Sequence, residues 1–160
     1  MKNKGMLLEK LINKTILFYK NNNLALFHKK ELDIKFHKVN NNFELVGAKI
    51  KSQSTIDYYG IHNGMFVAFE AKSTDQDTFA FRNLKSHQLK YLNKIVDLGG
   101  VAFIILGFNS YSRYFILPIN FICEYYKKSL NIKEIPNSVY ELELTFPGIL
   151  DFIPVIKKCG

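Results

Sequence analysis

Residues 54–72 read STIDYYGIHNGMFVAFEAK, and this segment carries the clearest structural signal in the chain. Asn63-Gly64 lies between two segments rich in β-branched and aromatic residues. Asn-Gly is the strongest short-range signal for a β-hairpin, because both central residues of a type I′ turn need a positive φ. We therefore expect two antiparallel strands, at 54–59 and 65–72, around a turn at Asn63-Gly64.

The turn also predicts a register for the hairpin. Counting outward from the Asn-Gly pair places Asp57 opposite Glu70. Two positions further from the turn, Thr55 lies opposite Lys72. Successive side chains of a strand alternate between its faces, so these four residues are expected to share one face. The other face is predicted to be apolar core and carries Ile56, Tyr58, Val67, Phe69 and Ala71.

Two carboxylates on directly opposed strands would have Cβ atoms roughly 4.5–5.5 Å apart and would repel each other. A divalent cation held by Asp57 and Glu70 would remove this repulsion, and oxygen ligands favour Mg²⁺ or Mn²⁺ over zinc. The Lys72 ammonium would lie where charge develops on a phosphate. The pattern thus predicts a metal-dependent phosphodiester hydrolase site. A surface hairpin with a Glu70–Lys72 ion pair stays open as the alternative, because so short a motif has many chance matches.

Two other polar residues lie on predicted helix faces that are otherwise apolar. Gln88 shares a helical stripe with Leu84, Tyr91 and Ile95 and therefore needs a hydrogen-bond partner. That partner is either the carboxylate site with its metal waters or a backbone group, and the residues alone favour the backbone. Glu9 is either a third carboxylate of the site or a favourable charge near a helix N-terminus, and in isolation the second interpretation is preferred.

The rest of the chain predicts a mixed α/β fold with a sheet at its centre, because helical and strand-like segments alternate along it. Residues 32–50 alternate with period two on either side of Asn40-Asn41-Asn42, which predicts a two-stranded projection. Residues 1–160 are expected to form one domain. The remaining expected elements are helices at 6–20, 83–98 and 119–128, strands at 24–28, 101–108 and 113–117, and a tail with a terminal helix.

Composition favours a polyanionic partner. The chain of 160 residues has a net charge of +8, and nucleic acid is the first candidate for such a balance. Of its 22 basic residues 20 are lysines, so compositional bias with solubility is the alternative explanation. Two cysteines and the absence of a signal peptide or an apolar membrane-spanning segment predict a cytoplasmic protein. The candidate DNA-binding residues are His28, Lys29, Lys30, Lys35, Lys38, Lys49 and Lys51.

Several short segments, in this order, resemble one family over nearly the whole chain. They are Gly5-Met6-x-x-Glu9, His28-Lys29-Lys30, Ser54-Thr55-x-Asp57-Tyr58-x-Gly60, Gly64-x-x-x-x-Phe69-Glu70-Ala71-Lys72, Phe79-x-Phe81 with Asn83, His87-Gln88 and Phe103-Ile104-Ile105. The chain resembles the RecU family of Holliday junction resolvases. It departs from the family pattern at Glu31 and Asp33, where a proline-containing segment is usual, and at Lys4, where arginine is usual.

The resemblance implies a restriction-endonuclease-like fold whose stalk, here 32–50, enters the centre of a DNA junction. It implies a homodimer that binds four-way junction DNA and makes paired, symmetric nicks with Mg²⁺, for which Mn²⁺ is a substitute. Asp57 and Glu70 would carry the metal, with Thr55 and Gln88 in its shell, and Lys72 would stabilise the transition state. A recombinase is a further candidate partner. The alternatives are a non-catalytic junction-binding or recombination-modulating protein on a nuclease fold and a general duplex endonuclease.

Overall fold

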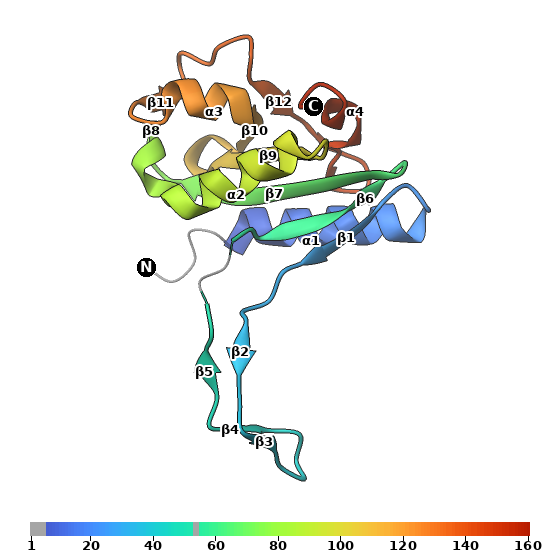
Figure 1. Ribbon diagram of the computed structural model, residues 1–160. Helices are drawn as coiled ribbons and strands as arrows, with labels where there is room; N and C mark the ends of the chain where they lie inside the picture. Colours follow the sequence, from blue (N-terminus) through green and yellow to red (C-terminus); the bar gives the residue numbers. More distant parts are fainter. Residues whose placement is uncertain (1–5, 53–54) are drawn as a thin grey trace.

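The computed structural model describes residues 6–52 and 55–160 (Figure 1). Gly5 and Ser54, which belong to the motifs above, lie outside the described residues. The central element is a six-stranded sheet in the order β1-β6-β7-β9-β10-β12. Its strands are β1 (Leu26–Lys29), β6 (Tyr58–His62), β7 (Met65–Thr74), β9 (Val101–Phe108), β10 (Arg113–Pro118) and β12 (Tyr140–Leu142).

Neighbouring strands are antiparallel except for β7 and β9, which run parallel. A parallel pair needs a crossover connection, and α2 (Ser86–Asp97) lies within it. The predicted mixed α/β class is confirmed. The central strand β9 is buried along its whole length, as its unbroken apolar sequence predicts.

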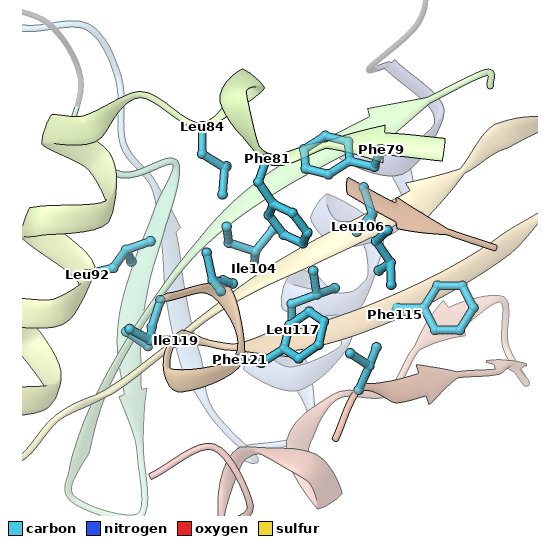
Figure 2. Close-up of a cluster of buried hydrophobic side chains, with 14 of the residues drawn as sticks. Phe79, Phe81, Leu84, Leu92, Ile104, Leu106, Phe115, Leu117, Ile119 and Phe121 are labelled. Atoms are coloured by element: carbon cyan, nitrogen blue, oxygen red, sulfur yellow. The ribbon is translucent and has the colours of Figure 1, made fainter. Parts of the chain in front are cut away.

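Helices cover both faces of the sheet (Figure 1). On one face, α1 (Met6–Asn21) packs its apolar side against alternate residues of β7 and β9. The residues of this cluster include Leu8, Ile12, Tyr19, Val67, Phe69, Phe103 and Ile105. On the other face, α2 and α3 (Ile119–Tyr125) cover the intervening residues of the same strands. Figure 2 shows this second cluster, which includes Phe79, Phe81, Leu92, Ile104, Leu106 and Phe121.

The hairpin forms around the predicted turn. Asn63 has a φ of 49° and Gly64 a φ of 77°, so both occupy the positive-φ region that the turn needs. The register runs as predicted from His62–Met65 to Tyr58–Phe69.

The expected strand over 54–59 is wrong at both ends, because it begins at Tyr58 and continues to His62. Ile56 was also predicted on the wrong face. It precedes the strand and packs with Ala68 and Ile104 under α2, whereas Tyr58 packs with Phe69 on the α1 side. Strand alternation therefore does not extend beyond Tyr58.

Other boundaries shift by a few residues. The predicted helix over 83–98 is a 3-10 turn, η1 (Phe81–Asn83), followed by α2. Leu92 takes the buried slot that the sequence assigned to Tyr91, which is 42% exposed. The remaining elements are η2 (Asn109–Tyr111), β8 (Thr78–Ala80) paired with β11 (Ser129–Asn131), β13 (Leu144–Thr145) paired with β14 (Ile149–Leu150), and α4 (Ile153–Ile156).

A narrow two-stranded ribbon, the stalk, projects away from the sheet (Figure 1). It consists of β2 (Ile34–Lys35) paired with β5 (Lys49–Ile50), and β3 (Lys38–Val39) paired with β4 (Leu45–Val46). The predicted protruding ribbon is thus confirmed. No helix among the described residues is long and apolar enough to cross a membrane.

Candidate active site

Glu70 is a buried carboxylate in the middle of the sheet. It lies on β7 between β6 and β9, on the face covered by α2, and is only 2% exposed. The Nζ atom of Lys72 lies 3.2 Å from its Oε1 atom, and the Nε2 atom of Gln88 donates a hydrogen bond to the same oxygen. Among the described residues, nothing hydrogen-bonds to Oε2 of Glu70, although that oxygen is buried.

Burial in a low-dielectric environment, together with the nearby Asp57 charge, raises the pKa of Glu70 to about 7. Lys72 and Gln88 act in the opposite direction without overcoming the burial. A cation bound at the free oxygen would favour the ionised carboxylate. The electrostatics and the unpartnered oxygen therefore both suit a positively charged ligand at this point.

Asp57 reaches Glu70 by a different route from the predicted one. The β6–β7 ladder ends at Tyr58–Phe69, one pair before Asp57. The carbonyl of Asp57 instead accepts a 2.7 Å hydrogen bond from the backbone N–H of Lys30, which follows β1. Its Oδ2 atom accepts the backbone N–H of Ala71 at 3.0 Å, so its carboxylate is directed towards β7. The two carboxylates are thus neighbours, as predicted, but not as an opposed ladder pair.

Thr55 lies at the edge of this group. Its Oγ1 atom is 3.3 Å from the Nζ atom of Lys30, from which it accepts a hydrogen bond. No strand pair joins Thr55 to Lys72, so their predicted cross-strand pairing is wrong. A hydroxyl oxygen has two lone pairs, so Thr55 can accept from Lys30 and still offer an electron pair to a cation.

The oxygen atoms present fit a hard divalent cation. Asp57 and Glu70 supply carboxylate oxygens, one of them buried and unpartnered, and Thr55 supplies a hydroxyl. The described residues hold no group of three or more His, Cys, Asp or Glu side chains that could bind a metal. Mg²⁺ retains several waters and is commonly bound through one or two carboxylates, so this sparse set fits it.

Gln88 satisfies both interpretations that its sequence position allowed. Its Nε2 atom donates to Glu70, and its Oε1 atom accepts the backbone N–H of Lys85 at the start of α2. The same side chain therefore fixes the beginning of α2 and orients the buried carboxylate.

Glu9 lies on α1, and its Oε1 atom is 3.1 Å from the Nζ atom of Lys29. Both side chains are more than one-third exposed. Its negative charge contributes to the raised pKa of Tyr58, for which burial is the larger cause and to which Asp57 also contributes. The structure thus places Glu9 in an ion pair at the edge of the sheet near Tyr58.

The other basic candidates divide between the edge of the sheet and the stalk. The His28 ring lies over Tyr59 on the exposed edge, with 5.9 Å between the ring centroids. On the stalk, Lys35 and Lys49 are directly paired across β2 and β5. Lys38 is paired with Val46, and the backbone N–H of Lys51 donates to the carbonyl of Asp33. Like charges paired across strands destabilise a sheet, which favours an anionic partner for this ribbon.

Sequence reasoning named Asp33 only as a departure from the family pattern and did not predict its contacts at the root of the stalk. Its Oδ2 atom lies 3.8 Å from the Nζ atom of Lys30 and accepts a hydrogen bond from Ser52 at 2.8 Å. The only local sequence feature that indicates its contact with Lys30 is the spacing of three residues between them. The contact with Ser52 spans 19 residues and depends on the stalk folding back.

Comparisons of the sequence with known proteins identify one family. The family model "RecU: Recombination protein U" matches residues 3–158. "Holliday junction resolvase RecU" of Mycoplasmopsis pulmonis is 40% identical over 157 residues, which cover 98% of this chain and 96% of the relative. The protein of the same name from Ureaplasma parvum is 38% identical over 161 residues, covering 98% and 93%. The solved structure of Archaeoglobus fulgidus Hjc is 10% identical, with a TM-score of 0.47, covering 95% of this chain and 99% of that one.

Proposed function

This chain belongs to the RecU family, and from that premise we propose that it is a Holliday junction resolvase, an endonuclease that cuts four-way DNA junctions. The observation that supports this most is the buried Glu70 carboxylate, which has one unpartnered oxygen, with Asp57 beside it and Lys72 in contact with it. Relatives named as resolvases match almost from end to end, so the proposal takes residues 1–160 as one nuclease domain with 32–50 as its stalk.

We propose that Asp57 and Glu70 hold Mg²⁺, with Mn²⁺ as a substitute, and that Thr55 contributes a further oxygen. Gln88 orients Glu70 from α2 and so belongs to the surroundings of the ion. When bound, the divalent cation supplies Lewis-acid stabilisation of the scissile phosphate. The chain's own contribution is to hold these oxygens in place before the ion arrives, through Ala71 N–H on Asp57 and Gln88 on Glu70.

Lys72 supplies a fixed positive charge at the same site. Its ammonium contacts Glu70, and the side chain is only 24% exposed, so it is partly shielded from water. Charge developing on a phosphate during cleavage is stabilised by such a preorganised cation. We therefore assign to Lys72 the stabilisation of the transition state. No residue is assigned to removing the proton from the attacking water.

Junction binding is proposed to rest on backbone contacts, because the net charge is +8 and the stalk presents several lysines. Paired symmetric nicks need two equivalent sites, so we propose a homodimer. A recombinase remains a candidate partner, and the proposed place of action is the cytoplasm.

The test is a cleavage assay on a synthetic four-way junction with labelled arms, with a linear duplex beside it at the same salt concentration. Wild type and Asp57→Asn are compared with Mg²⁺ and with EDTA. We expect symmetric nicks that need both Mg²⁺ and Asp57 and that are absent from the duplex. Asp57→Asn should still bind the junction, because the change removes one charge from a half-buried side chain.

Other outcomes would contradict the proposal in distinct ways. Junction binding by the wild type without any metal-dependent nicking would support a non-catalytic junction-binding protein. Equal cleavage of duplex and junction would support a general duplex endonuclease. Loss of binding together with cleavage in Asp57→Asn would indicate a structural role for that residue.

A further inference from the structure

Lys30 occupies the point where the chain leaves the sheet for the stalk. It directly follows β1, and the first strand of the stalk begins four residues later at Ile34. The other arm of the stalk returns through Lys51 and Ser52 towards Thr55. The stalk and the proposed metal-binding segment therefore meet at this residue.

Three contacts connect Lys30 to both sides of this meeting point. On the side of the site, its backbone N–H donates to the carbonyl of Asp57 at 2.7 Å, and its Nζ atom donates to Oγ1 of Thr55 at 3.3 Å. On the side of the stalk, the same Nζ atom lies 3.8 Å from Oδ2 of Asp33. One ammonium group is thus shared between the stalk and a proposed metal ligand.

Asp33 is itself fastened to the returning arm of the stalk. Its carbonyl accepts the backbone N–H of Lys51 at 2.7 Å, and its Oδ2 atom accepts the hydroxyl of Ser52 at 2.8 Å. Because both arms are joined at Asp33, a movement of the ribbon displaces the carboxylate that faces Lys30. The displacement reaches Thr55 through a single side chain.

From these contacts we propose that Lys30 is a positioning residue that couples the stalk to the metal-binding segment, so that the cleavage rate depends on the state of the stalk. This inference rests on the proposed function. The Lys30–Asp33 pair is suited to such a role because it is long and partly exposed, with side-chain exposures of 26% and 44%. An ion pair of this kind is weak and screened by salt, so a DNA phosphate can replace Asp33 as the partner of Lys30.

The coupling acts on Thr55 and Asp57. With Asp33 as a second partner, the Lys30 ammonium is shared, and its hydrogen bond to Thr55 is 3.3 Å long. When the stalk moves, the ammonium is redirected, and the hydroxyl oxygen of Thr55 changes its position relative to Asp57. Groups that orient metal ligands in this way typically change metal affinity or activity by about 10–100-fold when they are removed.

The experiment compares wild type with Lys30→Gln, Lys30→Arg, Asp33→Asn and the double variant of Lys30→Gln and Asp33→Asn. Lys133→Gln is the matched control, because Lys133 forms a similarly long exposed ion pair, 3.9 Å from Asp77, away from the site. Three quantities are measured for each: the single-turnover rate on a saturated junction, the junction Kd at fixed salt without Mg²⁺, and Mg²⁺ binding to the free protein by calorimetry. Circular dichroism and thermal unfolding verify folding.

We expect Lys30→Gln to slow saturated cleavage about 10–100-fold and to weaken Mg²⁺ binding, while Lys30→Arg restores most of both. Asp33→Asn should alter the rate in the wild-type background but not in the Lys30→Gln background, because the two residues act through one contact. Lys133→Gln should behave as wild type.

Two results would overturn the coupling. Additive effects of Lys30→Gln and Asp33→Asn would show that they act independently. If Lys30→Gln raises the junction Kd but leaves the saturated cleavage rate and Mg²⁺ binding unchanged, Lys30 is only a phosphate contact. If the wild type does not cleave junctions at all, the proposed function fails instead, and the Mg²⁺ calorimetry still tests the inference. If Lys30→Gln does not fold, Lys30→Arg and Asp33→Asn decide whether Lys30 couples the stalk to the metal-binding segment.

Discussion

Replacing Glu70 with glutamine is expected to stabilise the protein above pH 7 when no divalent cation is present. Burial raises the pKa of Glu70 to about 7 in the folded protein, against an ordinary value of 4.5. Between these values the folded protein binds more protons than the unfolded chain, so stability falls as the pH rises through this window. Each unit of difference between the folded and unfolded pKa corresponds to about 1.4 kcal/mol. Ionised Glu70 therefore lowers the free energy of unfolding by about 3 kcal/mol.

The assay is urea denaturation of wild type and Glu70→Gln at pH values from below 4.5 to above 7, in EDTA. Glutamine has nearly the same shape and can still accept the hydrogen bond from Gln88, so the main change is the loss of the titrating charge. The advantage of the variant should be small at low pH and grow to about 3 kcal/mol above pH 7. Added Mg²⁺ should stabilise the wild type and not the variant.

Glu141→Gln provides the control with the opposite sign. Arg113 makes two hydrogen bonds to Glu141 and holds the pKa of that carboxyl below its ordinary value. This variant should therefore lose stability relative to wild type as the pH rises through the ordinary range of a glutamate. A Glu70→Gln advantage that does not change with pH, or a variant less stable than wild type above pH 7, would refute the reasoning about Glu70.

Two further changes test the stalk and the edge of the sheet. Replacing Lys35 and Lys49 together by glutamine should weaken junction binding and reduce the slope of log Kd against log salt by about 2, since each lysine that neutralises a phosphate contributes about 0.9; an unchanged slope would show that they do not contact DNA. Gly60→Ala should cost about 1–3 kcal/mol in denaturant unfolding, because close packing gives no room for an added group. Its new Cβ would lie 2.1 Å from the Leu26 carbonyl oxygen, and a variant as stable as wild type would contradict this packing.

The hairpin could be predicted from the sequence because its information is local. Asn63-Gly64 determines the turn, and the turn determines the partners of the next five residues on either side. The prediction fails beyond Tyr58, where a side chain replaces the ladder: Oδ2 of Asp57 accepts the backbone N–H of Ala71, which a longer ladder would have paired with the carbonyl of Ile56. A count outward from the turn assumes backbone pairing and contains no information about a side chain that takes the N–H of the partner strand.

The predicted terminal helix is present as α4, but the packing of the C-terminal tail against α1 could not be predicted, because long-range contacts hold it. The hydroxyl of Tyr19 donates to Asp151 at 2.6 Å and accepts the backbone N–H of Phe152 at 2.8 Å. Burial is the largest cause of the raised pKa of Tyr19, so this hydroxyl stays protonated as a donor. The contact joins residues 132 apart, and nothing in the local pattern near Asp151 indicates a tyrosine on the first helix.

The arrangement of hydrogen-bond donors around Glu70 explains why the fold keeps a buried carboxylate that lowers its stability. Lys72 and Gln88 both contact Oε1, and none of the described residues hydrogen-bonds to Oε2. If these donors served stability alone, one on each oxygen would offset the burial better, because a buried acceptor without a partner carries its full desolvation penalty. Concentrating them on one oxygen orients the carboxylate and leaves the other, although buried, without a partner and so available to a ligand. A cation bound at Oε2 would offset part of this destabilisation, which links the stability measurement on Glu70→Gln to the proposed metal site.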